Sequence, residues 1–293
     1  MKLDVEDLDS LSQLAMKAAR EAGRHIQSRV EGELKIETKL GGSNLASQVV
    51  TEVDMESQNI ILEILESSLD QYDLALLTEE SEDDKSRFKK DFFWCIDPLD
   101  GTLPFTEASP GYAVSIALVS RCGESVIGVI YDPVKEDLYH AIKGQGDFCN
   151  GLPLDAKPKT NYLTLVNDRS FKKNLHYTEI LKSLEGFACE QGFEGVKTIL
   201  FGGAAMNAIW VLRNSPACYF KFPKREDGGG SLWDYAASAC LFKEADAHVS
   251  DIYGENLDLN RVDSSFMNHH GILYVSDKSL AKDLEALLSL GGA

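Results

Sequence analysis

Two aspartates three positions apart are the residues of this chain best suited to chemistry. Asp97 and Asp100 directly follow an apolar run over residues 92–96, in the stretch Asp-Pro-Leu-Asp-Gly-Thr. The run predicts a buried strand that ends where the acids begin. Two carboxylates at the end of a buried strand repel each other unless a cation lies between them. The alternative is a turn with capping acids, because Asp-Pro and Asp-Gly are both common turn dipeptides.

Three further acids stand at the ends of predicted elements. Glu79 follows a short predicted strand at 74–77, so two neighbouring strands would both end in carboxylates. Asp54 stands at the predicted N-cap of the next helix, and capping alone would explain it. Asp234 lies in the first turn of a helix that opens at 232, where the helix dipole alone would favour an acid.

Carboxylates that converge without histidine or cysteine form a site of hard oxygen ligands. Such a site suits Mg²⁺ or Mn²⁺ rather than Zn²⁺. Two ions about 3.5–4 Å apart can clamp an in-line displacement at phosphorus, one turning water into hydroxide and one neutralising the leaving oxygen. The carbonyl of Leu99 offers another oxygen, and Gly101 lets the backbone approach closely. The N–H groups of Gly101 and Thr102 can hold phosphate oxygens.

The charge balance narrows the classes of partner. The 293 residues include 29 Lys and Arg against 47 Asp and Glu, a net charge of −18. This charge argues against nucleic acid and anionic membranes as partners, and it would repel a phosphorylated substrate unless metal ions reverse the field locally. The acidic start is no signal peptide, and no apolar run approaches the ~20 residues of a membrane span. With six scattered cysteines interpreted as reduced thiols, we predict a cytoplasmic protein.

The predicted elements divide the chain into two halves. Helical periodicity at 7–30 precedes an antiparallel meander of strands at 112–120, 125–132 and 138–142. From residue 163 strands and helices alternate, which is typical of an α/β arrangement. Gly202 and Gly203 stand between a strand and a helix, where free N–H groups can seat an anion. We predict an α+β domain over 1–155 that carries most ligands, and an α/β domain over 156–293 that supplies Asp234 and the substrate-facing loops.

Three motifs, in order, resemble the inositol monophosphatase superfamily of magnesium-dependent, lithium-sensitive phosphatases. They lie at 78–81, 94–102 and 233–237, with supporting matches at 50–54, 144–151 and 202–207. The resemblance covers roughly residues 8–290. It implies a layered αβαβα sandwich with the site between the two halves, a homodimer, and inhibition by lithium at a magnesium site.

The resemblance also assigns ligand and catalytic roles. Two Mg²⁺ ions are implied, and a third would bind more weakly with help from Asp54. Thr102, paired with Asp54, would orient the attacking water, and Glu79 is counted with them as catalytic. The first ion would be held by Glu79, Asp97 and the Leu99 carbonyl, and the second by Asp97, Asp100 and Asp234.

Substrate contacts follow from the same resemblance. Gly101 and Thr102 would hold the phosphate, while Gly203 and Ala204 would line the alcohol portion. Asp227, seven residues before Asp234, stands close to where inositol-type members place an acid facing the sugar ring. The loop that contains Asp227 is longer than expected for the family, and this loop helps to choose the alcohol.

The sequence therefore predicts an enzyme that hydrolyses a small phosphorylated polyol, inositol monophosphate first, by attack of metal-activated water. A 3′(2′),5′-bisphosphate nucleotidase is the close rival, because Pro98-Leu99 also occurs in those relatives. A third reading is an inactive relative that keeps the fold as a binding module. The presence of every expected ligand argues against this third reading.

Overall fold

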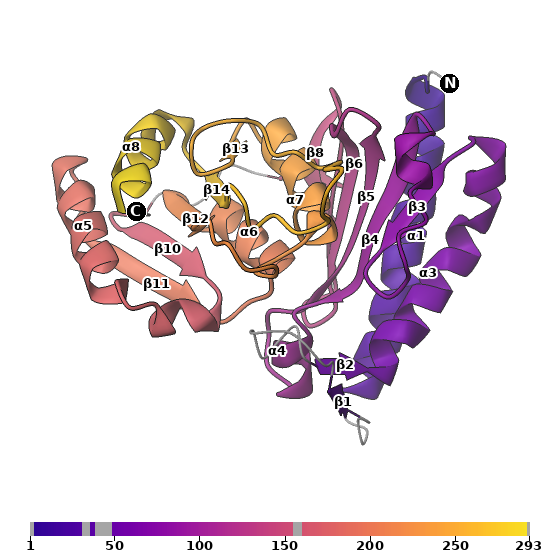
Figure 1. Cartoon of the computed structure of the whole chain (residues 1–293), viewed down its shortest axis with the longest axis horizontal. Helices are drawn as coiled ribbons and strands as arrows, with labels where there is room; N and C mark the ends of the chain where they lie inside the picture. Colours follow the sequence, from indigo (N-terminus) through magenta and orange to yellow (C-terminus); the bar gives the residue numbers. More distant parts are fainter. Residues whose placement is uncertain (1–2, 31–35, 39–48, 155–159, 292–293) are drawn as a thin grey trace.

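Figure 1 shows a computed structural model of the chain, of which residues 3–30, 36–38, 49–154 and 160–291 are described. Two large sheets alternate with three layers of helices in the order α, β, α, β, α. The outer helices on one side are α1 (Val5–Arg29) and α3 (Glu52–Gln71), and those on the other are α5 (Tyr177–Glu190) and α8 (Ala281–Gly291). The middle layer holds α6 (Ala204–Arg213) and α7 (Leu232–Glu244). The predicted αβαβα sandwich is confirmed.

The first sheet has seven strands in chain order, with β3 parallel to β4 and every later pair antiparallel. Helices α1 and α3 cover one face, because their apolar residues recur every three or four positions. A two-stranded ribbon of β1 (Ile36–Thr38) and β2 (Val49–Thr51) and the short helix α4 (Thr102–Thr106) lie outside this sheet. The strands of the seven-stranded sheet are β3 (Ala75–Thr78), β4 (Phe92–Asp100), β5 (Ala113–Ser120), β6 (Ser125–Asp132), β7 (Asp137–Ile142), β8 (Gly146–Cys149) and β9 (Leu152–Pro153).

Strand β4 does not end before its acids, so that prediction was wrong. The strand continues to Asp100, and its pairing with β5 shifts between Asp97, which lies opposite Ser115, and Asp100, which lies opposite Ala113. Three steps on β4 therefore match two on β5, as in a β-bulge. The extra residue bends the strand and re-aims its side chains, which keeps both aspartates on an ordered element.

The second sheet has five strands in the order β11-β10-β12-β14-β13. Strand β10 runs parallel to both β11 and β12, so the carboxyl ends of these three strands lie at one edge. The meander and the alternating half were both predicted, whereas β13 and α4 were not. The strands are β10 (Leu163–Asn167), β11 (Val196–Leu200), β12 (Ala217–Lys221), β13 (His248–Ser250) and β14 (Ile272–Val275).

The middle helices lie in the largest buried core. Helix α7 contacts strands of the first sheet and β13 of the second, and most of its residues are buried. It crosses β6 at Gly128, where an added Cβ would lie 2.3 Å from the Ala237 carbonyl oxygen. The depth at which α7 sits, and hence the position of Asp234, depends on this close approach.

Other expectations meet the structure in different ways. Among the helices of the described residues, none has the length and apolarity that a membrane crossing needs. The six cysteines are free, and Cys95, Cys218 and Cys240 are buried. The predicted domain boundary at 155/156 lies outside the described residues and stays a prediction.

Gly128→Ala should lower the free energy of unfolding by about 1–3 kcal/mol, because the methyl group would overlap the α7 backbone. Urea denaturation measures the change. The matched control is Gly186→Ala in α5, where nothing lies within 4 Å of the added Cβ. The control should be neutral, or stabilising by up to about 1 kcal/mol. Wild-type stability in Gly128→Ala would contradict the packing described above.

Candidate metal centre

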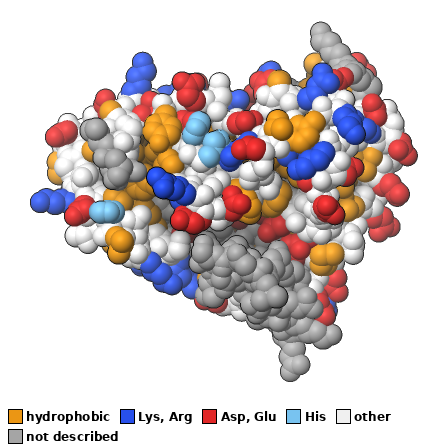
Figure 2. All heavy atoms as spheres, in the orientation of Figure 1, with side chains coloured by type: hydrophobic (Ala, Val, Ile, Leu, Met, Phe, Trp, Pro, Cys, Tyr) orange, Lys and Arg blue, Asp and Glu red, His pale blue; other side chains and the backbone are white. Residues whose placement is uncertain are grey.

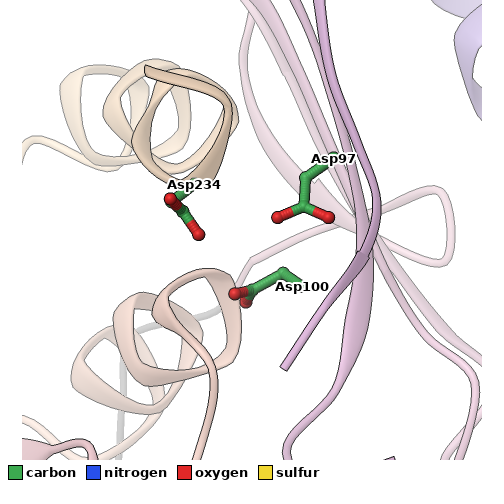
Figure 3. A group of neighbouring side chains, drawn as sticks. All are labelled: Asp97, Asp100 and Asp234. Atoms are coloured by element: carbon green, nitrogen blue, oxygen red, sulfur yellow. The ribbon is translucent and has the colours of Figure 1, made fainter. Parts of the chain in front are cut away.

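Three aspartates from distant parts of the chain meet between the two halves. Carboxylate oxygens of Asp97, Asp100 and Asp234 all lie within 4.8 Å of one another. Asp97 and Asp100 are buried and Asp234 is half-buried. Figure 3 shows the three side chains pointing toward one another, two from β4 and its end and one from α7.

Local hydrogen bonds fix the geometry at the end of β4. The Leu99 N–H donates to Asp97 Oδ1 at 3.0 Å, and the Thr102 hydroxyl donates to the Leu99 carbonyl at 3.4 Å. Gly101 follows with φ +85°, and an added Cβ would lie 2.8 Å from the Gly111 carbonyl oxygen. Only glycine combines this left-handed conformation with so close an approach. The turn therefore brings the Thr102 hydroxyl next to the Leu99 carbonyl.

Helix α7 is anchored where it delivers Asp234. Ser231 and Asp234 form a capping box, in which the Asp234 carboxylate accepts from the Ser231 N–H. The Ser115 hydroxyl donates to the Trp233 carbonyl at 3.0 Å, and Ser115 lies opposite Asp97 in the sheet. One serine thus ties the start of α7 to the strand beside Asp97.

Glu79 and Asp54 are near enough to Asp97 for their charges to act on it. Glu79 follows β3, and its N–H donates to the Ile96 carbonyl at 3.2 Å, so the parallel register sets it alongside Asp97. Asp54 is buried in the first turn of α3, two residues after the helix begins. The N-cap position predicted for Asp54 was wrong, because the helix starts at Glu52. The predicted pairing of Asp54 with Thr102 stays a prediction.

Gln58 is a positioning residue that the sequence reasoning missed. Its side-chain amide accepts a hydrogen bond from the Thr78 hydroxyl at 2.6 Å and donates one to the Ser81 hydroxyl at 3.0 Å. These two bonds fix the chain just before and just after Glu79. Gln58 is buried and stands one helical turn after Asp54. That i, i+4 spacing was a usable signal, since both side chains lie on one face of the helix.

The anion-binding site predicted at Gly202 and Gly203 is occupied by a side chain of the protein, the carboxylate of Asp100. The Asp100 carboxylate accepts from the Ala204 N–H at 3.0 Å and the Ala205 N–H at 2.7 Å. A Cβ on Gly203 would lie 2.5 Å from Asp100 Oδ2, so only glycine fits there. Gly203 and Ala204 therefore border the centre, and their contact with the substrate stays a prediction.

The long loop before α7 places its charges unevenly. Asp227 is exposed, and its charge acts on Lys224. Its proximity to a substrate ring stays a prediction. Lys221, the last residue of β12, was missed as a functional residue because the prediction treated it only as part of a strand end and of the loop that follows. Its positive charge acts on both Asp100 and Asp234.

Burial and mutual repulsion raise the pKa values of the clustered acids. Burial is the main cause for Asp97, whose pKa rises well above its ordinary value, with Glu79 and Asp100 adding to the rise. Burial and the charge of Asp234 raise the pKa of Asp100 to about 7, and burial raises that of Asp234. A divalent cation would relieve this repulsion, and the donors are oxygens, so the residues fit Mg²⁺.

Comparison with known proteins agrees with this geometry. The inositol monophosphatase family matches residues 7–288. The chain belongs to this family. The match spans both halves of the chain and includes all the acids described above. As a member of the inositol monophosphatase family, the chain is a phosphatase.

Individual relatives of this family member are moderately similar. "Nus factor SuhB" of Vibrio cholerae is 32% identical over 243 residues, 82% of this chain and 85% of that protein. "Inositol-1-monophosphatase" of Bacillus subtilis is 27% identical over 264 residues, 90% of this chain and 91% of that protein. The solved structure of extragenic suppressor protein suhB from Bartonella henselae superposes with a TM-score of 0.73 at 25% identity, covering 96% and 99% of the two chains.

With a metal chelator in the buffer, the free energy of unfolding should fall as the pH rises from about 4 to 7. Folded Asp100 holds its proton up to a pKa of about 7, whereas an unfolded aspartate loses it near 3.9, so the folded state binds more protons across this window. One such group contributes at most about 1.4 kcal/mol per pH unit. Urea titrations at several pH values measure the slope.

Asp100→Asn should flatten that slope, because the amide does not titrate. Asp70→Asn, on the exposed face of α3, is the control and should leave the slope as it is. A slope that is the same in wild type and Asp100→Asn would show that Asp100 ionises as freely in the folded state as in the unfolded state.

Proposed function

We propose that this phosphatase is a Mg²⁺-dependent phosphomonoesterase that hydrolyses a small phosphorylated polyol, with inositol monophosphate as the first candidate. The observation that carries the proposal is the convergence of carboxylate oxygens of buried Asp97, buried Asp100 and half-buried Asp234 within 4.8 Å. Without a cation this arrangement is unfavourable, so it points to a built ion site. The family relationship supports phosphate ester hydrolysis as the chemistry of that site.

The residues divide between two Mg²⁺ ions. When bound, Mg²⁺ supplies charge neutralisation at the phosphoryl oxygens and lowers the pKa of water. The charges of Glu79, Asp100 and Asp234 all act on Asp97, which would suit a carboxylate that contributes to both ions. Asp54 would support a third, weaker ion. The first site takes Glu79, Asp97 and the Leu99 carbonyl, and the second takes Asp97, Asp100 and Asp234.

The other assigned residues orient the reactants. The Thr102 hydroxyl, held near the Leu99 carbonyl, would turn to Asp54 and orient the attacking water. Backbone N–H groups of Gly101 and Thr102 would hold the phosphate, which fixes the reacting phosphorus in line with that water. Gly203 and Ala204 would line the alcohol portion beside Asp100.

A 3′(2′),5′-bisphosphate nucleotidase remains the second candidate, favoured by the presence of Lys221 beside the acids. We also propose, from the family relationship, a homodimer, inhibition by lithium and a cytoplasmic location. Lithium would compete with Mg²⁺ for the carboxylates, so raised Mg²⁺ should weaken its effect.

Phosphate release from polyol, sugar and nucleotide phosphates should require Mg²⁺ and stop in chelator. Asp97→Asn should lower kcat by about 10²–10³-fold or more, because the shared carboxylate is lost. Asp70→Asn is the charge-matched control and should keep wild-type activity. Full activity in Asp97→Asn would contradict the proposal, and turnover of the bisphosphate nucleotide alone would favour the second candidate.

Added Mg²⁺ should also raise the thermal midpoint of the wild type and not that of Asp97→Asn, since a ligand that binds only the folded state stabilises it. This measurement separates loss of the ion from loss of the fold. In chelator Asp97→Asn should be at least as stable as the wild type, because it removes one buried charge from the cluster.

A further inference from the structure

One arginine is completely buried where the two halves of the chain meet. Figure 2 shows Lys and Arg side chains spread over the visible surface, whereas Arg87 exposes none of its side chain. Arg87 lies in the short 3₁₀ helix η1 (Ser86–Phe88), which packs against β3. Burying a charged group is unfavourable unless partners replace the water that it loses. The partners of Arg87 therefore indicate what this placement does for the fold.

These partners come from both halves. The Nε of Arg87 donates to Asp83 Oδ2 at 2.8 Å, four residues earlier in the same loop. Its Nη1 donates to Asn260 Oδ1 at 2.5 Å, and Asn260 lies 173 residues later in the chain. Asn260 is itself buried, and its amide donates to the Arg121 carbonyl at 2.8 Å. We call the set Asp83, Arg87 and Asn260 the latch.

On the first-half side, the latch belongs to the loop that carries Glu79. This loop begins with Glu79 at the end of β3 and continues through Asp83 to η1. At its start the Glu79 N–H donates to the Ile96 carbonyl at 3.2 Å. Further along, the ion pair of Asp83 with Arg87 fixes the loop a second time. The position of the Glu79 segment therefore depends on Arg87.

The guanidinium also lies near the acidic cluster. Cys95 stands two residues before Asp97 on β4, so their side chains point to the same face of the strand. Burial raises the pKa of the Cys95 thiol, and the charges of Arg87 and Asp234 both act on it. Arg87 is therefore a cation on the face of the first sheet that carries the metal centre.

On the second-half side, the latch belongs to the segment between β13 and β14. Figure 1 shows this segment extending from the second sheet toward the first, and Asn260 makes its contacts with Arg87 and Arg121 there. The next residue, Arg261, donates from Nη1 to the Phe266 carbonyl at 2.9 Å. The position of Phe266 is therefore tied to that of Asn260.

Phe266 in turn contacts the start of α7. It forms an isolated β-bridge with Ser231, and beside this bridge the Leu232 N–H donates to the Ser265 carbonyl at 2.8 Å. Ser231 is the N-cap of α7 and forms the capping box with Asp234. Described contacts thus lead from Asn260 to the residue that orients Asp234.

We propose that Arg87 is a positioning residue for the metal centre, because through Asp83 and Asn260 it fixes the Glu79 segment relative to the start of α7. The inference rests on the proposed function, in which Glu79 belongs to the first ion and Asp234 to the second. Mg²⁺ requires nearly ideal octahedral geometry. Ligands from opposite halves meet this requirement only if the spacing of their segments is fixed.

A contact that merely stabilises the folded state is the competing interpretation. Within the described residues the Nη2 of Arg87 is buried and has no hydrogen-bond partner. An incompletely satisfied buried ion pair is a poor source of stability, and apolar residues often do better in its place. The two interpretations differ in their effect on the ions. Loss of a merely stabilising contact lowers the free energy of unfolding, whereas loss of a positioning contact also weakens Mg²⁺ binding by the folded protein.

Calorimetric titration of Mg²⁺ into the wild type and Asn260→Ala tests the latch without substrate. This variant removes the second-half partner and keeps the ion pair of Asp83 with Arg87. Well below the thermal midpoint, where both proteins are folded, Asn260→Ala should bind Mg²⁺ about tenfold more weakly. The matched control is Arg24→Gln, which breaks an exposed ion pair with Glu21 within α1 and should bind Mg²⁺ as the wild type does. Wild-type affinity in Asn260→Ala would overturn the proposal.

A double-mutant cycle tests whether Arg87 acts through Asn260. Arg87→Lys keeps the charge and loses the fork that reaches two partners at once, so it should also weaken Mg²⁺ binding about tenfold. The double variant R87K/N260A should bind Mg²⁺ no more weakly than either single variant. Additive losses, about a hundredfold together, would show that the two residues act separately and would overturn the latch.

Hydrogen exchange with a chelator present tests the latch without any metal. In Asn260→Ala the Leu232 N–H and the Glu79 N–H should exchange about tenfold faster than in the wild type, because both segments are loosened. Amides of α1 should change only as far as the global stability does. If no ester is hydrolysed, the proposed function fails while Mg²⁺ binding and exchange still decide the latch. Wild-type exchange at either amide would overturn it.

Discussion

The repulsion among buried carboxylates is the constraint around which this structure is organised. Asp97, Asp100 and Asp234 would separate in water, yet the first sheet and the middle helix layer hold their oxygens within 4.8 Å of one another. Backbone N–H groups of other residues donate to the carboxylates of Asp97, Asp100 and Asp234. The positive charge of Lys221 also stabilises the arrangement. These contacts offset part of the cost, and a divalent cation would offset the rest. Strain of this kind is typical of sites that bind metal.

The two halves supply different things to the centre. The first half gives an ordered strand whose bulge sets the two aspartates of the Asp-Pro-Leu-Asp stretch, and Gln58 steadies the neighbouring acid Glu79. The second half gives the starts of α6 and α7 and the lysines of the long loop. The halves also meet directly, since Ser115 holds the Trp233 carbonyl and Asp100 holds the start of α6. The first half thus supplies Asp97 and Asp100, and the second half supplies Asp234.

Sequence reasoning recovered what local pattern determines. Alternation and periodicity identified the meander and α1, whereas the layered architecture was predicted from the family resemblance. The sequence also predicted that Asp97, Asp100 and Asp234 would lie close together, and they do. It failed where the answer depends on distant parts of the chain. The end of β4 was misplaced because β5 pairs with Asp100 through a register shift. The partner of the α6 N-terminus was not foreseen because Asp100 lies about a hundred residues earlier. Lys221 was passed over because a lysine at a strand end is ordinary until its ion pair with Asp168 is seen.

The contact between Asp100 and the first N–H groups of α6 has a consequence for biosynthesis. Asp97 and Asp100 leave the ribosome well before residues 204 and 234, so a nascent chain carries two acids that have neither their helix nor their third companion. A complete ion cage therefore exists only after the second half has emerged and docked. Synthesis truncated before α7 leaves an incomplete set of carboxylates, so full ion binding would report that the chain through α7 has been made and docked.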